Sequence, residues 1–159
     1  MFYKISIGIS GGQTGADRAF LDVCIALGIP HGGWCPAGRR AEDGRIPDIY
    51  LLKETSSNKY SARTRMNVID SDATVIFNRH RRLSAGSRLT VRFCQEAARP
   101  YLVLDCKTAE IDIELMCAWL EQHRPKVLNV AGNREETTPG IGEYVRELLT
   151  KLFSVEISQ

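Results

Sequence analysis

Apolar and polar residues alternate along this chain with two different periods, one typical of strands and one typical of helices. Residues 4–9 alternate polar and apolar side chains, as a half-buried strand does. From Ala16 to Leu27 the apolar residues recur at spacings of three and four, which places them on one helical face. Gly28 follows at a position where helices commonly end. The pattern therefore predicts a strand over residues 4–9 and a helix over residues 16–27.

The change of period recurs along the rest of the chain. Two continuous apolar runs, A-T-V-I-F from Ala73 and Y-L-V-L from Tyr101, are typical of strands buried on both faces. Between them, and again towards the C-terminus, apolar residues return at helical spacing. The pattern predicts three further strands over residues 73–77, 101–104 and 127–130, and three further helices over residues 87–98, 110–123 and 141–152.

Strand and helix signals that alternate along a chain indicate a parallel sheet with helices on both faces. We therefore expect an α/β fold, a Rossmann-like three-layer α/β/α arrangement with a mostly parallel sheet. The chain has 159 residues and no visible repeat or linker, so one domain over residues 1–159 is expected. Residues 29–59 are rich in glycine, proline and charge, and we expect a short strand there that opens into a long functional loop.

Cysteine usage and the absence of targeting patterns indicate a cytoplasmic protein that does not cross a membrane. The five cysteines form no C-x-x-C pair and lie mostly in apolar segments, so we expect reduced thiols that fill core space and no metal site. Cys35 is a weaker candidate for contact with a metal or a thiol-reactive ligand. The N-terminal residues do not have the basic and apolar regions of a signal peptide.

Positive charge is concentrated in the middle third of the chain. Between Arg39 and Arg92 there are ten arginines and two lysines against six acids, although the whole chain has a net charge of only +2. The planar guanidinium group binds phosphate or carboxylate with two parallel hydrogen bonds. This distribution predicts a polyanionic partner bound by the middle third of the chain. The partner that we expect is a small anionic phosphorylated ligand.

The stretch S-G-G-Q-T-G-A-D, residues 10–17, lies between the first strand and the first helix. Ligands of open parallel sheets bind beyond the carboxyl ends of the strands, where glycine lets them approach the backbone and helix N-termini attract anions. We expect an anion-binding loop there, although a tight turn without a ligand would use the same residues. The expected ligand contacts are Gly11, Gly12, Gln13, Thr14 and Gly15.

This loop matches neither common nucleotide motif. No Lys-Ser/Thr pair follows the glycines, and Ser10 occupies the position where a dinucleotide motif needs glycine. ATP hydrolysis and NAD chemistry are therefore disfavoured.

A second helix start, A-G-S-R-L-T from Ala85, follows another predicted strand and adds a second candidate anion site. Ser87 is the expected N-cap of this helix, and Asn78, directly after the strand, is a further expected ligand contact. We expect the two loops to share one crevice, because both lie beyond the carboxyl ends of parallel strands. Both sites matter, since a single helix terminus contributes only about 0.3–1 kcal/mol to anion binding.

Four blocks of the sequence resemble the molybdenum carrier proteins of the SLOG superfamily. They are S-G-G-Q-T-G-A-D-R-A from Ser10, G-G-W-C-P-A-G-R-R-A-E-D-G from Gly32, R-T-R-M-N-V-I-D-S-D-A-T from Arg63, and G-S-R-L-T from Gly86. The resemblance implies a Rossmann-like fold, a homo-oligomer such as a dimer or tetramer, and binding of molybdenum cofactor, a phosphorylated pterin dithiolene. The site residues that it implies are Gly11, Gly12, Gln13, Thr14, Gly15, Arg39, Arg63, Gly86, Ser87 and Thr90.

The same superfamily contains nucleotide phosphoribohydrolases of the LOG type, whose phosphate loop reads P-G-G-x-G-T-x-x-E. Thr90 occupies the position of the glutamate here, so the acid/base group of that reaction is replaced. The hypothesis is therefore a carrier for a phosphorylated heterocyclic ligand, with no catalytic residues. An enzyme acting on a nucleotide or nucleotide-sugar phosphate, with Asp17 or Glu42 as base, is the alternative. Binding of single-stranded nucleic acid through residues 79–88 is weaker, because few aromatic residues lie near that segment.

Overall fold

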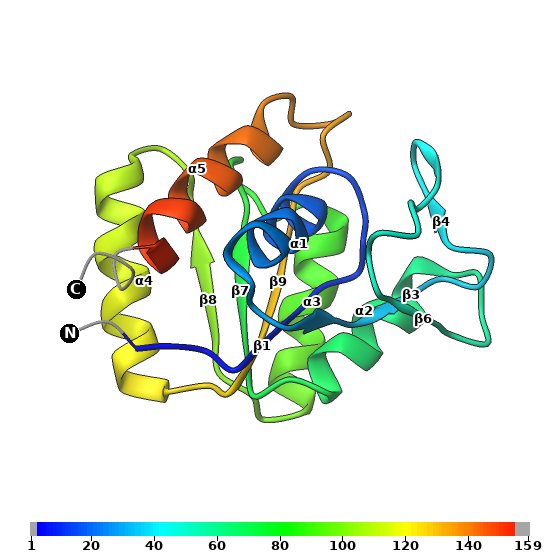
Figure 1. The fold of residues 1–159 in the computed structure, drawn as a ribbon, viewed down its shortest axis with the longest axis horizontal. Helices are drawn as coiled ribbons and strands as arrows, with labels where there is room; N and C mark the ends of the chain where they lie inside the picture. The colour runs from blue at the N-terminus through cyan, green and yellow to red at the C-terminus, as the bar shows by residue number, and fades with distance from the viewer. Residues whose placement is uncertain (1–2, 155–159) are drawn as a thin grey trace.

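A five-stranded parallel sheet forms the centre of the molecule in the computed structural model, which describes residues 3–154 (Figure 1). Residues 1–2 and 155–159, the ends of the predicted domain, lie outside the described residues. The strands occur in the order β2-β1-β9-β7-β8, and every neighbouring pair is parallel. The expected α/β class is confirmed. The strands are β1 (Ile7–Ile9), β2 (His31–Gly32), β7 (Ala73–Phe77), β8 (Tyr101–Leu104) and β9 (Val127–Gly132).

The last strand in the sequence, β9, is the central strand of the sheet. On one side Leu128 pairs with Gly8 of β1, and on the other side Asn129 pairs with Thr74 of β7. The first two strands of the sheet and the two strands from the middle of the chain are therefore joined only through β9.

Helices cover both faces of the sheet (Figure 1). Three of them, α1, α4 and α5, supply buried apolar residues to the main core, whereas α2 and α3 pack against each other on the opposite face. The helices are α1 (Ala16–Leu27), α2 (Tyr60–Ile69), α3 (Ala85–Glu96), α4 (Ala109–His123) and α5 (Ile141–Ser154).

The two faces of the sheet differ in polarity because successive side chains of a strand point to opposite faces. Val75 and Leu128 lie in the main core with α1 and α5. Their neighbours Thr74 and Asn129 are also buried, and Asn129 Nδ2 donates a hydrogen bond to Thr74 Oγ1 over 3.2 Å. The face covered by α2 and α3, called the polar face below, therefore buries a pair of polar side chains beside apolar ones such as Ile76.

Most predicted elements are confirmed, with differences at their ends. The helix over residues 16–27 is found as expected, and Gly28 caps it with a left-handed backbone at φ 69°. The first strand is shorter than predicted and the last is longer. β8 was expected to be buried on both faces, but it is an edge strand, and Val103 is 37% exposed.

The predicted N-cap of the helix after β7 is wrong. Ser84 caps α3, and its side chain accepts a hydrogen bond from Ser87 N over 3.2 Å. Asn78 Oδ1 holds Ser84 in place by accepting a bond from its backbone N–H over 3.1 Å. Ser87 therefore lies within the first turn of the helix, and its hydroxyl is not used as the cap.

Helix α2 was not predicted, because its buried face does not carry an apolar stripe. Its buried residues are Arg63, Asn67 and Val68, two of which are polar. Asn67 Nδ2 donates to Trp34 O over 3.0 Å, and Asn67 Oδ1 accepts from Trp34 N over 2.8 Å. Side-chain hydrogen bonds thus replace the apolar contacts on which a periodicity argument depends.

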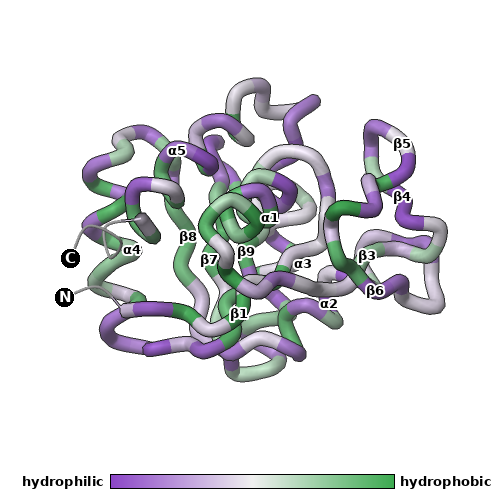
Figure 2. The backbone as a smooth tube through the Cα atoms, viewed as in Figure 1, coloured by the Kyte–Doolittle hydropathy of each residue, from purple (hydrophilic) through white to green (hydrophobic). Residues whose placement is uncertain are grey.

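Residues 29–59 form ordered structure in place of the expected long loop. Beyond β2, two short pairs, parallel β3–β6 and antiparallel β4–β5, lie beside the main sheet, and the β4–β5 hairpin is mostly hydrophilic (Figures 1 and 2). A second small core supports them, formed by Leu21, Cys35, Ala41, Ile46 and Tyr50. The four strands are β3 (Trp34–Cys35), β4 (Arg40–Ala41), β5 (Gly44–Arg45) and β6 (Lys53–Glu54).

All five cysteines are free thiols, and all except the half-buried Cys117 are buried, which confirms their expected role in packing. Cys35 lies in the second core. Within residues 3–154, no helix is long and apolar enough to span a membrane, and no three His, Cys, Asp or Glu side chains are grouped to hold a metal ion.

Candidate functional site

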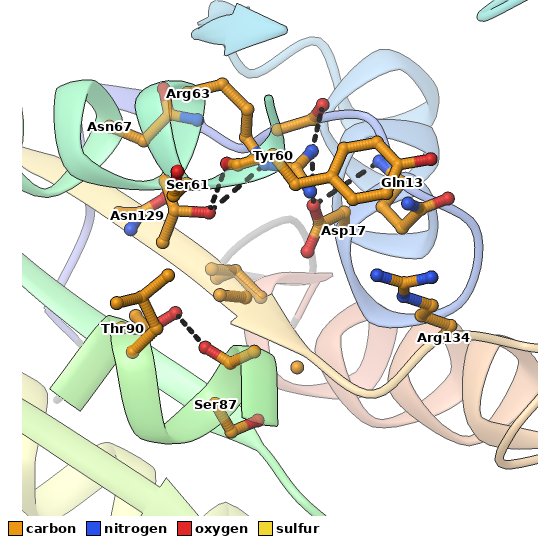
Figure 3. A pocket seen from close by; sticks show the side chains of 17 residues that line it. Gln13, Asp17, Tyr60, Ser61, Arg63, Asn67, Ser87, Thr90, Asn129 and Arg134 are labelled. Atoms are coloured by element: carbon orange, nitrogen blue, oxygen red, sulfur yellow. Dashed lines mark hydrogen bonds and ion pairs between the residues drawn. The ribbon is translucent and has the colours of Figure 1, made fainter. Parts of the chain in front are cut away.

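A pocket opens at the carboxyl end of β9, between helices α2 and α3 (Figure 3). Ser87 and Thr90 of α3 lie on one side of it, and Tyr60, Arg63 and Asp17 lie on the other. The pocket thus occupies the polar face of the sheet, at the edge where ligands of parallel sheets bind. Six of the predicted site residues line it: Gly11, Gln13, Arg63, Gly86, Ser87 and Thr90.

The wall formed by α3 presents an open backbone and a buried hydroxyl without a partner. A Cβ added at Gly86 would meet no atom within 4 Å, so this residue leaves the backbone accessible. Ser87 is 2% exposed, and its Oγ has no hydrogen-bond partner among the described residues. A buried hydroxyl without a partner costs about 1–3 kcal/mol, which a ligand oxygen would offset. Thr90 Oγ1 is already used, because it donates to Gly86 O over 3.0 Å.

Gln13 supplies a second buried donor from the opposite loop. Its Oε1 accepts hydrogen bonds from Thr14 N over 3.1 Å and from Glu42 N over 2.9 Å, which fix the orientation of the amide. The residue is 4% exposed, yet Nε2 has no partner within the described part of the chain. Among the described residues, the pocket therefore combines an unpaired N–H donor from the glycine loop and an unpaired hydroxyl from the first turn of α3.

A buried ion pair between Arg63 and Asp17 joins helix α2 to the segment that follows β1. Arg63 Nη1 lies 3.8 Å from Asp17 Oδ2 and donates to Gly11 O over 2.9 Å. Asp17 Oδ2 also accepts a hydrogen bond from Gln13 N over 3.3 Å. Burial raises the pKa of the Asp17 carboxyl, and the Arg63 guanidinium opposes this rise. The pair fixes the glycine loop against α2.

The glycines of residues 11–15 allow parts of the protein to approach one another, which differs from the expected open anion loop. A Cβ at Gly11 would lie 2.6 Å from Arg63 Nη1, and one at Gly12 would lie 2.6 Å from Leu52 Cδ1. A Cβ at Gly15 would lie 2.3 Å from Asn133 O. Of the three, only Gly11 lines the pocket.

Five predicted site residues lie outside the pocket lining: Gly12, Thr14, Gly15, Arg39 and Asn78. Arg39 donates from its guanidinium to the carbonyl oxygens of Ile46, Pro47, Tyr50 and Leu52. Asn78 Nδ2 donates to His80 O and Arg82 O, which shapes the basic loop before α3. Thr14 Oγ1 contacts Glu42 Oε1. These side chains support neighbouring loops.

Sequence reasoning predicted Arg63 but missed the other contributions of α2, including the ring of Tyr60. The guanidinium carbon of Arg40 lies 4.4 Å from the centroid of this ring, that of Arg134 lies 5.0 Å away, and that of Arg63 lies 5.2 Å away. Arg134 was detectable because it follows the last strand, but Tyr60 belongs to a helix without an apolar pattern. The pocket residues absent from the prediction include Tyr60, Ser61, Thr64, Asn67, Asn129 and Arg134.

Comparisons with known proteins agree with this fold. The chain is similar to the crystal structure of a "Putative molybdenum carrier protein" from Syntrophus aciditrophicus SB, with 43% sequence identity and a TM-score of 0.92. The match covers 96% of this chain and 97% of that one. A search of curated proteins gave no significant match. Residues 8–153 match the model of the circularly permutated YpsA SLOG family, and the chain therefore belongs to this family.

Proposed function

We propose that this protein binds a small phosphorylated heterocyclic ligand and carries it without changing it chemically. The observation that carries the proposal is the pair of buried donors without partners, Ser87 Oγ and Gln13 Nε2, at one pocket. The first turn of α3 adds partial positive charge beside Ser87, and Gly86 leaves room for a ligand oxygen. Phosphate oxygens and the acceptor atoms of a heterocycle match such donors.

Molybdenum cofactor is the ligand that we favour. The similar structure is named for a molybdenum carrier, and the cofactor is a phosphorylated pterin whose ring carries hydrogen-bond acceptors. In this proposal Ser87 and the α3 N-terminus bind the phosphate, and Gln13 Nε2 donates to the pterin. The cofactor is cargo here, so no reaction step is assigned to it.

Native mass spectrometry of protein purified from cells that make the cofactor tests this proposal. We expect an additional mass on the wild-type protein that Ser87→Ala reduces by about tenfold or more, because a hydrogen bond to a charged group contributes about 1.5–3 kcal/mol. Ser56→Ala, in an exposed loop, is the matched control and should retain the mass. Equal occupancy of wild type and Ser87→Ala would contradict the proposed site.

One observation favours a second candidate, hydrolysis of a nucleotide. Asp17 lines the pocket, and burial raises the pKa of its carboxyl, as is common for general bases. Incubation with a panel of nucleotides would then release a base or phosphate, and Asp17→Asn would stop the release. A carrier should yield no product from any member of the panel.

The proposal extends to a cytoplasmic homo-oligomer. Free thiols that are mostly buried are consistent with a reducing compartment. Size-exclusion chromatography with light scattering tests the assembly, and a mass of one 17.8 kDa chain would contradict it.

A further inference from the structure

Three guanidinium groups converge on the ring of Tyr60 beside the pocket. Arg40, Arg134 and Arg63 all have their guanidinium carbon between 4.4 and 5.2 Å from the ring centroid. Arg63 has a carboxylate nearby, since its Nη1 lies 3.8 Å from Asp17 Oδ2. Neither Arg40 nor Arg134 forms an ion pair with any carboxylate in residues 3–154.

The three arginines come from separate parts of the fold. Arg40 lies in β4, Arg63 lies in α2, and Arg134 follows β9. Arg40 is exposed and Arg134 is half-buried, while Tyr60 and Arg134 both line the pocket. The cluster is therefore at the mouth of the pocket, where an incoming ligand would contact it.

The charges of this cluster are not balanced by the protein. A guanidinium over a tyrosine ring gains a modest attraction, but like charges gathered on one ring repel one another. Arg40 and Arg134 retain their hydrogen-bond donors, since no described residue accepts a hydrogen bond from either side chain. An anion placed between them would relieve the repulsion and accept paired hydrogen bonds from each.

We propose that Arg40 and Arg134 form a second anion subsite at the pocket mouth, and that the ligand therefore carries two anionic groups. One group binds at Ser87 and the α3 N-terminus, and the other binds between the two arginines. The chemical class is a diphosphate, or a phosphate ester with a second acidic group. This inference rests on the proposed function, because the inner subsite is the pocket of that proposal.

Calorimetric titration with phosphate, pyrophosphate and tripolyphosphate at constant ionic strength tests the second subsite. We expect affinity to rise from phosphate to the longer anions in the wild-type protein. Arg40→Gln and Arg134→Gln should each weaken binding of the longer anions by about fivefold or more, while phosphate binding changes less. Arg45→Gln is the matched control, because it removes one charge from the same hairpin, where Arg45 Nη1 pairs with Asp48 Oδ1 over 2.8 Å.

The outcomes separate this inference from the proposed function. If Arg40→Gln and Arg134→Gln lose no more affinity than Arg45→Gln, or if affinity in the wild type does not rise with anion length, the second subsite is wrong. Phosphate binding that depends on Ser87 would then still support the inner site. If Ser87→Ala binds phosphate as the wild type does, the inner site fails instead. Should Arg134→Gln not fold, Arg40→Gln decides the question, because Arg40 is exposed.

Discussion

At the scale of single residues, Gly15 and Gly38 illustrate two reasons why a position requires glycine: its backbone conformation and close contact with a neighbouring loop. Both have a positive φ angle, 83° at Gly15 and 80° at Gly38, and a ψ of −127° places Gly15 outside the left-handed helical region. A Cβ at Gly38 would meet no atom within 4 Å, whereas one at Gly15 would lie 2.3 Å from Asn133 O. Both positions therefore favour glycine for their backbone, but only Gly15 also requires it for steric contact.

We expect Gly38→Ala to lower the free energy of unfolding by about 1 kcal/mol, the cost of the left-handed backbone. Gly15→Ala should cost about 3 kcal/mol or more, because the loop of Asn133 must also move. Urea denaturation of both variants measures the difference. Equal losses would mean that the contact between the two loops contributes nothing.

His31 makes stability depend on pH. Its Nε2 accepts a hydrogen bond from Leu51 N over 3.2 Å, and burial lowers its pKa below the ordinary 6.5. The folded chain then binds a proton more weakly than the unfolded chain. The stabilisation is present in full above pH 6.5 and is lost as the pH falls through the folded-state pKa.

We expect the wild type to lose stability between pH 7.5 and pH 5, because the unfolded chain then binds a proton at His31 more strongly than the folded chain does. His31→Gln removes the titrating group, so its stability should fall less over the same range. Urea denaturation at both pH values measures the loss of stability in each protein. The other titrating groups are the same in both proteins, so their contributions cancel in the comparison. An identical loss in both proteins would exclude His31 as the cause.

At the scale of elements, sequence pattern predicts an element well when its buried face is apolar. The helix α5 was recognised because its buried residues are apolar at helical spacing, and β7 because all five of its residues are buried and mostly apolar. The helix α2 buries Arg63 and Asn67, so its pattern resembles that of a loop. The site follows the same rule: pocket residues after strands could be predicted, whereas of the residues that α2 contributes only Arg63 was predicted, from the family resemblance and not from the apolar pattern.

The segment 39–52 depends on Arg39, whose guanidinium donates to four carbonyl oxygens. Lysine has one ammonium group and cannot reproduce this planar set of donors. We expect Arg39→Lys to cost about 2–4 kcal/mol, because several buried carbonyls would lose their donors. Arg45→Lys on the exposed side of the same segment should change stability by less than about 0.5 kcal/mol. Thermal denaturation followed by circular dichroism compares them, and similar melting temperatures would contradict this role of Arg39.

At the scale of the whole molecule, one face of the sheet holds the main core that stabilises the fold, and the other holds the pocket proposed to bind the ligand. The apolar residues of α1, α4 and α5 form the main core on one face, while the pocket occupies the polar face under α2 and α3. Substitutions in the pocket can therefore change binding without loss of stability.

Gly86→Ala tests this division. A Cβ there meets no atom within 4 Å, and alanine is favoured over glycine in helices, so stability should rise by up to about 1 kcal/mol. The methyl group lies at the pocket wall, so the increase in melting temperature caused by inorganic phosphate should become smaller than in the wild type. Gly38→Ala provides the comparison outside the pocket. A larger phosphate effect in Gly86→Ala would contradict the proposed binding wall.

The central position of β9 has a consequence for how the chain folds during its synthesis. Until residues 127–132 leave the ribosome, the strand pairs β1–β2 and β7–β8 each lack the neighbour that joins them. Unpaired strand edges of this kind attract other extended chains, and pairing between distant segments is slow. Completion of the sheet therefore waits for residues 127–132, and a chain interrupted before Val127 would be prone to aggregate.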